Sequence, residues 1–190
     1  MKTFLIASLA LAAAGVANLA QAQTYNADPT HTFVNFEVKH YGTSTLRGRF
    51  DKKEGSVTID RAAKTGKVDF TIDMTSVSTG VAPLDTHLKS KDFFNAAENP
   101  TAKFVGDKFA FDGSKLSSVT GTLTMAGKSL PVTLTATNFN CYDNAMLKRE
   151  VCGGDFETTI KRSDWGVSYG LTYGIPDNVR LLVQVEAVKQ

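Results

Sequence analysis

The amino-acid sequence predicts an all-β fold, an antiparallel barrel or sandwich of about eight or nine strands. Through most of the chain, apolar and polar residues alternate with a period of two, which is typical of strands with one buried face. Turn-forming residues separate these runs, and segments with helical periodicity are almost absent. Because a barrel of eight strands either is filled by side chains or holds one small ligand, the question is what the apolar faces enclose.

The first strand is expected over residues 34–40. Val34, Phe36 and Val38 alternate with polar residues, and a turn signal at residues 28–29 precedes them. Later runs repeat this design, and the two that follow most closely in sequence should pair as an antiparallel hairpin. The further strands are expected at 57–59, 68–74, 103–105, 109–111, 119–125, 130–136, 156–160 and 179–185.

One long segment, residues 75–101, does not alternate. Asp85 can cap a short helix there, and we expect a helical insert over about residues 84–95. An excursion of this length between barrel strands is typical of a lid or plug at one end of the barrel. The adjacent Phe93 and Phe94 can anchor the insert, close the mouth of an internal cavity, or do both.

The N-terminus has the pattern of a secretory signal peptide. The leader begins with one positive charge, continues with an apolar run, and ends with small residues at Ala20 and Ala22. We therefore expect residues 1–22 to be removed after Ala22, leaving residues 23–190 as a single domain. A short leader with one lysine suits a bacterial exported protein, so the periplasm is the expected location. No later run is long and apolar enough for a membrane-spanning helix.

The two cysteines, Cys141 and Cys152, flank a segment that we expect to be a loop. An even pair in an exported protein predicts a disulfide, because that compartment is oxidising. A redox-active role is not expected, since the spacing is far from Cys-x-x-Cys.

Composition and motifs argue against several classes of function. The formal net charge is only +2 and no basic cluster occurs, so nucleic acid is not an expected partner. His31, His40 and His87 lack metal-ligand spacing, which predicts no metal site. There is no Gly-x-Ser-x-Gly and no glycine-rich phosphate loop, so we expect neither an enzyme nor a cofactor.

The apolar faces of the expected strands define a candidate interior. On the residues alone an ordinary packed core explains them best, because small barrels are usually filled. The members of this interior are Phe36, Val38, Phe70, Ile72, Phe104, Leu123, Leu134, Phe156, Ile160 and Val183.

Short motifs follow one another along the whole chain after the leader. They are Asp28-x-x-His31, Phe36-x-Val38-x-His40-x-Gly42, Gly48-x-Phe50, Asp85-x-His87-Leu88-x-Ser90-x-Asp92-Phe93-Phe94, Pro100-x-x-x-Phe104, Val119-x-Gly121-x-Leu123-Thr124-x-x-Gly127, Pro131-Val132, Arg162-Ser163-Asp164-Trp165-Gly166 and Asp177-x-Val179-x-Leu181-x-Val183. Each motif is weak alone. In this order, they resemble the YceI-like lipid/polyisoprenoid-binding family.

This resemblance implies an extended, lipocalin-like barrel in an exported soluble protein. Its elongated apolar tunnel would hold a long-chain isoprenoid lipid or an isoprenoid quinone such as ubiquinone, which favours a tunnel over a packed core. Trp165 stands where many members have Phe, and the cysteine pair is not general in the family. The expected ligand-binding residues are Phe36, Val38, His40, Phe70, Ile72, Phe93, Phe94, Phe104, Leu123, Leu134, Phe156, Ile160, Trp165 and Val183.

Two polar residues are candidates for contact with the head group of such a ligand. For His40 this contact is a hypothesis, which unchanged binding in His40→Ala would remove. Arg162 is expected to pair with Asp164, because ion pairs within loops are common, but it could instead meet a polar head.

The sequence leaves other interpretations open. The chain could be an exported stress or interaction protein with a packed barrel and no ligand, or a small outer-membrane barrel with its apolar faces outward. The break at residues 75–101 and the non-aromatic end at Gln190 argue against the membrane barrel. The leading interpretation is a periplasmic lipid carrier that exchanges its ligand by transient contact with membranes. A homodimer is left open.

Overall fold

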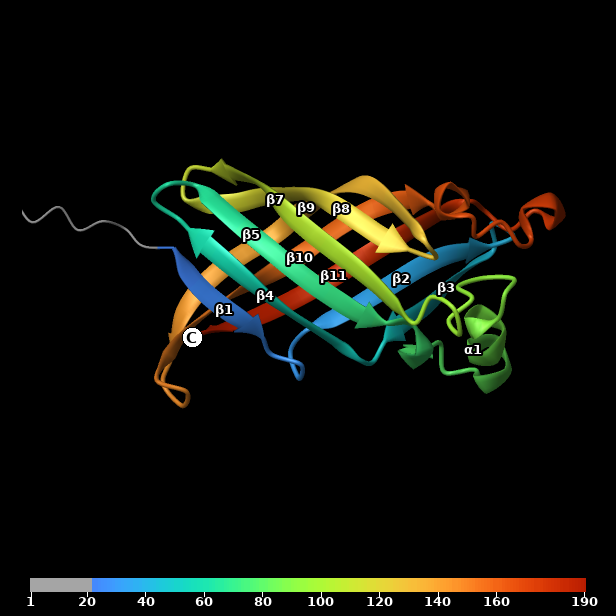
Figure 1. Cartoon of the computed structure of the whole chain (residues 1–190), viewed down its shortest axis with the longest axis horizontal. Coiled ribbons are helices and arrows are strands. Elements are labelled where there is room, and N and C mark those ends of the chain that lie inside the picture. Colours follow the sequence, from blue (N-terminus) through green and yellow to red (C-terminus); the bar gives the residue numbers. More distant parts are fainter. Residues whose placement is uncertain (1–21) are drawn as a thin grey trace, which may run out of the picture.

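Within residues 22–190, eleven strand segments form one antiparallel sheet that closes on itself as a barrel, accompanied by one short α-helix (Figure 1). The computed structural model describes residues 22–190, so the predicted leader lies outside the described residues except for Ala22. The strands are β1 (Gln23–Ala27), β2 (Phe33–His40), β3 (Ser44–Phe50), β4 (Lys53–Asp60), β5 (Thr65–Asp73), β6 (Val77–Ser78), β7 (Thr101–Asp112), β8 (Lys115–Met125), β9 (Lys128–Asn144), β10 (Arg149–Lys161) and β11 (Asn178–Lys189).

Three barrel strands are each interrupted once, which is why eleven segments build an eight-stranded barrel. β1 and β2 lie end to end along β11 and together make one barrel strand. In the same way β4 and β3 lie along β1 and β2, and β5 and β6 lie along β4 and β3. The predicted antiparallel barrel is confirmed, and β4 and β5 form the expected hairpin. The runs predicted at 103–105 and 109–111 are a single strand, β7, whose pairing with β8 shifts register after Gly106.

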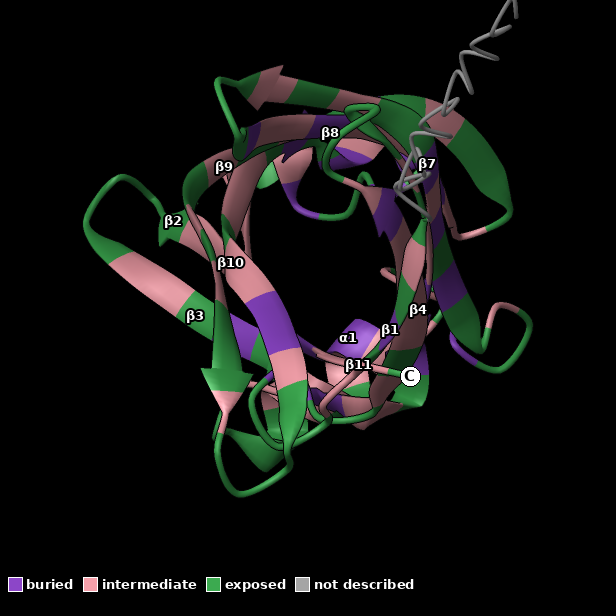
Figure 2. Cartoon of the chain, turned by 90° about the vertical axis from the view of Figure 1, so that its left-hand side faces the viewer, coloured by how far each residue is buried: buried purple, intermediate pink, exposed green. Residues whose placement is uncertain are grey.

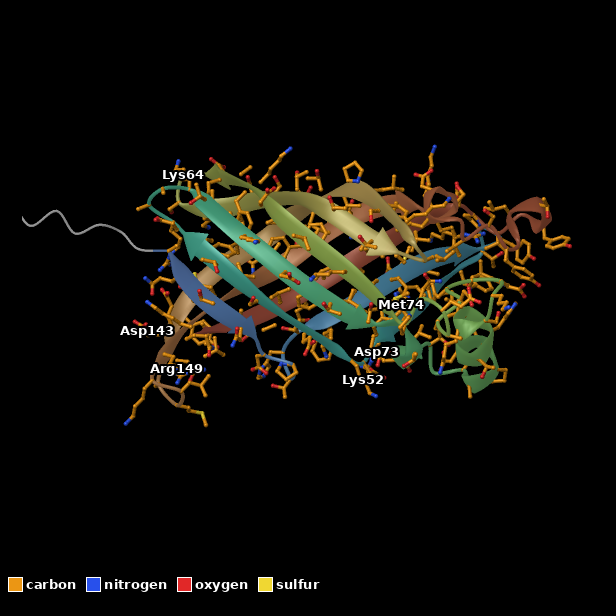
Figure 3. All side chains as sticks on the ribbon, viewed as in Figure 1. Lys52, Lys64, Asp73, Met74, Asp143 and Arg149 are labelled. Atoms are coloured by element: carbon orange, nitrogen blue, oxygen red, sulfur yellow. A yellow bond between two sulfur atoms is a disulfide. The ribbon has the colours of Figure 1, made fainter. Side chains whose placement is uncertain are left out.

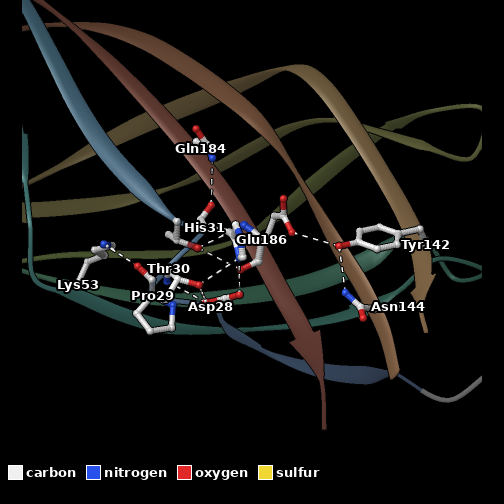
Figure 4. Close-up of polar contacts among 10 residues, drawn as sticks. Asp28, Pro29, Thr30, His31, Lys53, Tyr142, Asn144, Gln184 and Glu186 are labelled. Carbon is white, nitrogen blue, oxygen red and sulfur yellow. Dashed lines mark hydrogen bonds and ion pairs between the residues drawn. The ribbon is translucent and has the colours of Figure 1, made fainter. Parts of the chain in front are cut away.

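Side chains hold the break between β1 and β2 together, at residues 28–32 (Figure 4). Asp28 accepts hydrogen bonds from the backbone N–H and the hydroxyl of Thr30, at 2.8 and 2.7 Å, and its Oδ2 lies 2.7 Å from Nδ1 of His31. The fully buried Thr32 donates its hydroxyl to the carbonyl of Glu186 at 3.1 Å and accepts from the N–H of Glu186 at 3.3 Å. The Thr32 side chain therefore satisfies backbone groups of β11 where the strand ladder is interrupted.

Replacing Thr32 with Val should destabilise the barrel. The change keeps the shape of the side chain but removes the hydroxyl that accepts from the N–H of Glu186, and the loss of that partner costs about 1–3 kcal/mol, while the Glu186 carbonyl still accepts from the N–H of Asp28 at 2.8 Å. Chemical denaturation would measure the loss of free energy of unfolding. The matched control is Thr133→Val on the exposed face of β9, which should change that free energy by no more than about 0.5 kcal/mol. Equal losses in the two variants would contradict the role given to Thr32.

The contact between Asp28 and His31 should make stability depend on pH. The hydrogen bond and charge of Asp28 raise the pKa of His31, while His31 and Thr30 lower the pKa of Asp28 to about 2. A raised folded-state pKa means that protonation of His31 favours folding. This stabilisation is complete below the unfolded pKa of about 6.5 and is lost as the pH rises through the folded value.

His31→Gln should therefore lower the free energy of unfolding at about pH 5 and change it much less at about pH 9. Denaturation of the variant and the parent at both pH values would measure the difference. His40→Gln is the control, because the His40 ring packs on Tyr41 and not on a carboxylate. A loss of the same size at both pH values would show that the ionic contact with Asp28 contributes nothing.

The insert covers the end of the barrel that lies away from the C-terminus (Figure 1). Its helix, α1 (Ala82–Lys89), begins and ends earlier than the predicted 84–95, and Pro83 sets the backbone of its first turn. Asp85 is not the N-cap as predicted, because it lies inside the helix and Val81 is the N-cap; its carboxylate accepts hydrogen bonds from the N–H and hydroxyl of Thr79, both at 2.7 Å. No helix in the described part of the chain is long and apolar enough to cross a bilayer.

The segment flanked by the cysteines is a long hairpin and not the predicted loop. β9 and β10 continue through both cysteines, and the turn occupies residues 145–148. Cys141 and Cys152 lie opposite each other in the ladder, 4.1 Å apart at Cα, and form the predicted disulfide. The alternation is obscured here because Asn and Gly, which are uncommon in strands, occupy several positions.

Apolar side chains point into the barrel, and the charged side chains of the described residues, Arg162 excepted, are exposed or half-buried. Figure 2 views the barrel along its long axis, with α1 at the far end. Figure 3 shows Lys64, Asp143 and Arg149 on the outside, at the end away from α1, and all three are exposed. Every strand contributes at least one buried apolar residue, and apolar side chains of every strand except β6 line a cavity inside the barrel. This orientation is the reverse of what the outer-membrane alternative requires.

Candidate ligand-binding site

The interior of the barrel contains two cavities. The barrel cavity, with a volume of about 140 Å³, is lined by strands alone and has an apolar wall. The capped cavity, with a volume of about 290 Å³, is also lined by the insert (79–100) and by the loop 162–177 between β10 and β11. Leu181 of β11 lines both, so its side chain belongs to the walls of the two cavities. The interior is therefore not the fully packed core that the residues alone favoured.

The predicted ligand-binding residues divide between the cavities, apart from Trp165. Those that line the barrel cavity are Phe70, Ile72, Phe104, Leu123, Leu134, Phe156 and Val183. Those that line the capped cavity are Phe36, Val38, His40, Phe93, Phe94 and Ile160. Alternation along the strands places these side chains on the inner face. That they contact a ligand stays a prediction.

Two phenylalanine rings lie across glycines of the neighbouring strand and shape the lumen. Phe36 is paired with Gly48 in the ladder, and a Cβ at Gly48 would lie 2.2 Å from the ring. Phe70 is paired with Gly55 in the same way, where a Cβ would lie 2.4 Å from the ring. Because only glycine leaves room, each ring can lie flat against the wall and leave the centre of the barrel open.

An aromatic cluster of His87, Phe93 and Tyr169 joins the insert to the loop 162–177. The ring of His87 lies 4.9 Å from both of the other rings, and Phe93 lies 5.2 Å from Tyr169. The Nε2 atom of His87 is 3.0 Å from the carboxylate of Asp92. Phe93 therefore both anchors the insert and lines the capped cavity, and so unites the two roles considered from the sequence.

Phe94 has the same double position on the other side of the insert. Its ring lies 5.9 Å from that of Phe50, the last residue of β3, and both side chains line the capped cavity. His40 lines this cavity too, and its ring packs edge-on against Tyr41 at 4.8 Å. Contact of His40 with a head group remains a prediction.

Arg162 lies inside the protein, with 6% of its surface exposed, and lines the capped cavity. Its guanidinium donates to carbonyl groups of the loop and not to Asp164, so the predicted ion pair is wrong. The acceptors are Val167 and Tyr169, at 3.0 and 2.7 Å from Nη1, Pro176 at 3.0 Å from Nε, and Ile175 at 3.4 Å from Nη2. Burial lowers the pKa of Arg162 from its ordinary value. These bonds tie the loop into its compact fold.

Trp165 lines neither cavity. The ring is 3% exposed, packs in the core cluster that contains Phe104 and Leu123, and donates its indole N–H to the carbonyl of Leu123 at 3.1 Å. Its position places it behind the cavity wall, where it fastens the loop 162–177 to β8. The motif resemblance could not separate a residue in the wall from one behind it.

The described residues include one group with metal-ligand proximity, Cys141, Glu150 and Cys152. Both sulfur atoms belong to the disulfide, and Glu150 accepts hydrogen bonds from Tyr25 and Arg61. Burial and Glu150 raise the pKa of Tyr25 to about 12. These three residues are therefore held in place by the disulfide and by the hydrogen bonds of Glu150, which is a structural role.

Several lining residues are not predicted by the sequence. Tyr25 lies on β1, which is too short and too close to the leader to show a clear alternation. Leu84, Tyr169 and Ile175 line the capped cavity from segments without strand periodicity. Leu181 does lie on an expected strand, but alternation cannot indicate which inward side chain lines two cavities.

Comparison with known proteins agrees with this architecture. A family model described as a YceI-like domain matches residues 25–187. A UPF0312 protein of Pseudomonas aeruginosa (strain LESB58) is 36% identical over 189 residues, which cover 97% of each chain. The crystal structure of Burkholderia cenocepacia BcnA matches with a TM-score of 0.72 and 28% identity, over 85% of this chain and 99% of that one.

A more distant structure, described as a polyisoprenoid binding domain from Saccharophagus degradans, shares the fold. Its TM-score is 0.63 at 18% identity, and the match covers 88% of this chain and 99% of that one. The region matched by the family model extends from β1 to β11 and contains nearly every residue that lines the two cavities. The chain therefore belongs to the family of proteins with a YceI-like domain.

Proposed function

We propose that this protein is a periplasmic carrier that holds a long-chain isoprenoid lipid or an isoprenoid quinone in its two cavities. The observation that carries the proposal is the pair of cavities inside one closed barrel, both of which Leu181 lines. The barrel cavity offers an isoprenoid chain an apolar wall, and the capped cavity adds polar residues to its lining. The description of the Saccharophagus degradans domain as polyisoprenoid-binding supports this choice of ligand class.

The energetics permit useful affinity. Burial of about 400 Å² of lipid surface contributes roughly 10 kcal/mol at about 25 cal/mol per Å². Association costs at least about 4 kcal/mol, which leaves about 6 kcal/mol at most and corresponds to a Kd of tens of micromolar. Apolar contacts of this kind select a chain by its length and width and discriminate little between head groups.

Exchange with a membrane is proposed to occur at the end of the barrel that carries the insert. Tyr41, Val81, Tyr169 and Tyr173 are exposed around this end. Tyrosine side chains favour the interface between water and bilayer because they combine an apolar ring with a polar hydroxyl. A transient contact through these residues would bring the capped cavity close to lipid.

Native mass spectrometry tests the proposal directly. The chain from Gln23 onward would be exported to the periplasm and purified without detergent, and an organic extract of it would be analysed separately. We expect a stoichiometric adduct that extracts as a prenyl lipid or quinone. A clean unliganded mass, unchanged by incubation with quinones and polyprenyl lipids, would instead indicate an exported interaction or stress protein without a ligand.

Filling the space beside Leu181, which lines both cavities, should prevent long chains from binding. Leu181→Trp places a large ring at this shared position, so we expect affinity for a long-chain quinone to fall at least about tenfold, or 1.4 kcal/mol. Quenching of intrinsic fluorescence by the quinone would measure the affinity of each variant.

Leu182→Trp is the matched control, because the adjacent strand residue points to the opposite face of the sheet and lines neither cavity. It should bind like the parent. A Leu181→Trp variant that is folded and binds the long chain normally would show that the chain does not pass Leu181.

A further inference from the structure

Residues with polar or charged side chains contribute to the lining of one of the two cavities and not to the lining of the other. The wall of the barrel cavity is apolar throughout. The capped cavity is lined by Lys39, His40, His87 and Arg162 among its apolar residues. Of these four residues, Arg162 is the buried one, and its guanidinium carries a positive charge inside the protein. A ligand that spans both cavities therefore meets two different environments.

The guanidinium of Arg162 has an N–H donor that is not used within the described part of the protein. It carries five N–H groups. Nε donates to Pro176, and Nη1 uses both of its hydrogens on Val167 and Tyr169. Nη2 makes one long contact, 3.4 Å, to Ile175. Within residues 22–190, no acceptor is recorded for the second hydrogen of Nη2.

The charge of Arg162 is also not neutralised by direct contact with a carboxylate. All four acceptors are uncharged carbonyl groups. Asp177 is near enough to favour the charged form, but its carboxylate accepts from the N–H and hydroxyl of Ser163, at 2.9 and 2.7 Å. A buried cation without a bound anion attracts any oxygen that carries negative charge, and hydrogen bonds to charged groups are the stronger kind.

We propose that Arg162 binds the head group of the ligand, and that the head lies in the capped cavity while the isoprenoid tail extends past Leu181 into the barrel cavity. This inference rests on the proposed function. The head must supply an oxygen acceptor to Nη2, such as a quinone carbonyl or a phosphate oxygen. Isoprenoid hydrocarbons without such an oxygen would bind by burial of the tail alone.

The test compares three probes with one another: ubiquinone, undecaprenyl phosphate and squalene, which has no head group. Each is titrated into the parent protein, Arg162→Lys and Arg180→Lys. Arg180 is the matched control, because it lies on the outer face of β11 and pairs with Glu37 and Glu157. The readout is the ratio of headed to headless affinity, which a merely weakened fold would not change.

We expect Arg162→Lys to lower affinity for ubiquinone, undecaprenyl phosphate or both by about tenfold or more, with squalene affinity nearly unchanged. Arg180→Lys should behave like the parent. The outcome also identifies which oxygen the site prefers. An equal loss for all three probes, or no loss for any, would overturn the inference. If the parent bound none of the probes, the proposed function itself would fail.

A measurement on the parent protein avoids any effect of substitution on folding. Infrared difference spectra with ubiquinone labelled by ¹³C at its ring carbonyls would follow their stretching frequency. A hydrogen bond from a guanidinium lowers that frequency for one carbonyl relative to an apolar solvent. Bound ubiquinone with both carbonyls at their apolar-solvent frequencies would place the quinone head away from Arg162 and would overturn its assignment to ubiquinone. The phosphate titration would then decide alone.

Discussion

Closure of the sheet along β11 is the constraint on which the rest of the molecule depends. One edge of β11 pairs with β10 along nearly its whole length, and the other edge is shared by β2 and β1. Between these two partners the chain leaves the ladder, and the buried hydroxyl of Thr32 bonds to both backbone groups of Glu186. The sheet therefore has no open edge at this point, which a barrel requires.

A closed barrel of this size creates an interior, and its side chains decide how much of it stays empty. Where phenylalanine faces a cross-strand glycine, as at Phe36 and Phe70, the ring lies along the wall. The insert and the loop 162–177 then cover one end, joined by the cluster of His87, Phe93 and Tyr169. The shape and polarity of the interior thus differ between its two cavities. The barrel cavity is apolar, and the capped cavity has a buried cation in its lining.

Prediction from the sequence was most accurate for the inward-facing residues of regular strands. The inward residues of β5, β7, β8 and β11 follow from alternation, because a strand turns every second side chain to the same face. The helix boundaries and the hairpin at the cysteines were predicted less well. Pro83 favours an earlier start of α1 than Asp85 suggests, and the Asn and Gly content of β9 and β10 hides two strands that pair on both sides of the cysteines.

The all-β class, the family, the disulfide partners and most of the inward faces follow from the amino-acid sequence, because they depend on local periodicity and on motifs in their order along the chain. The tertiary structure alone decided three other matters. Trp165 lies behind the cavity wall, and Arg162 donates to four carbonyl groups and not to Asp164. Leu181 lines both cavities. Each of these depends on distances between segments far apart in the chain, and such distances are set only when the barrel closes.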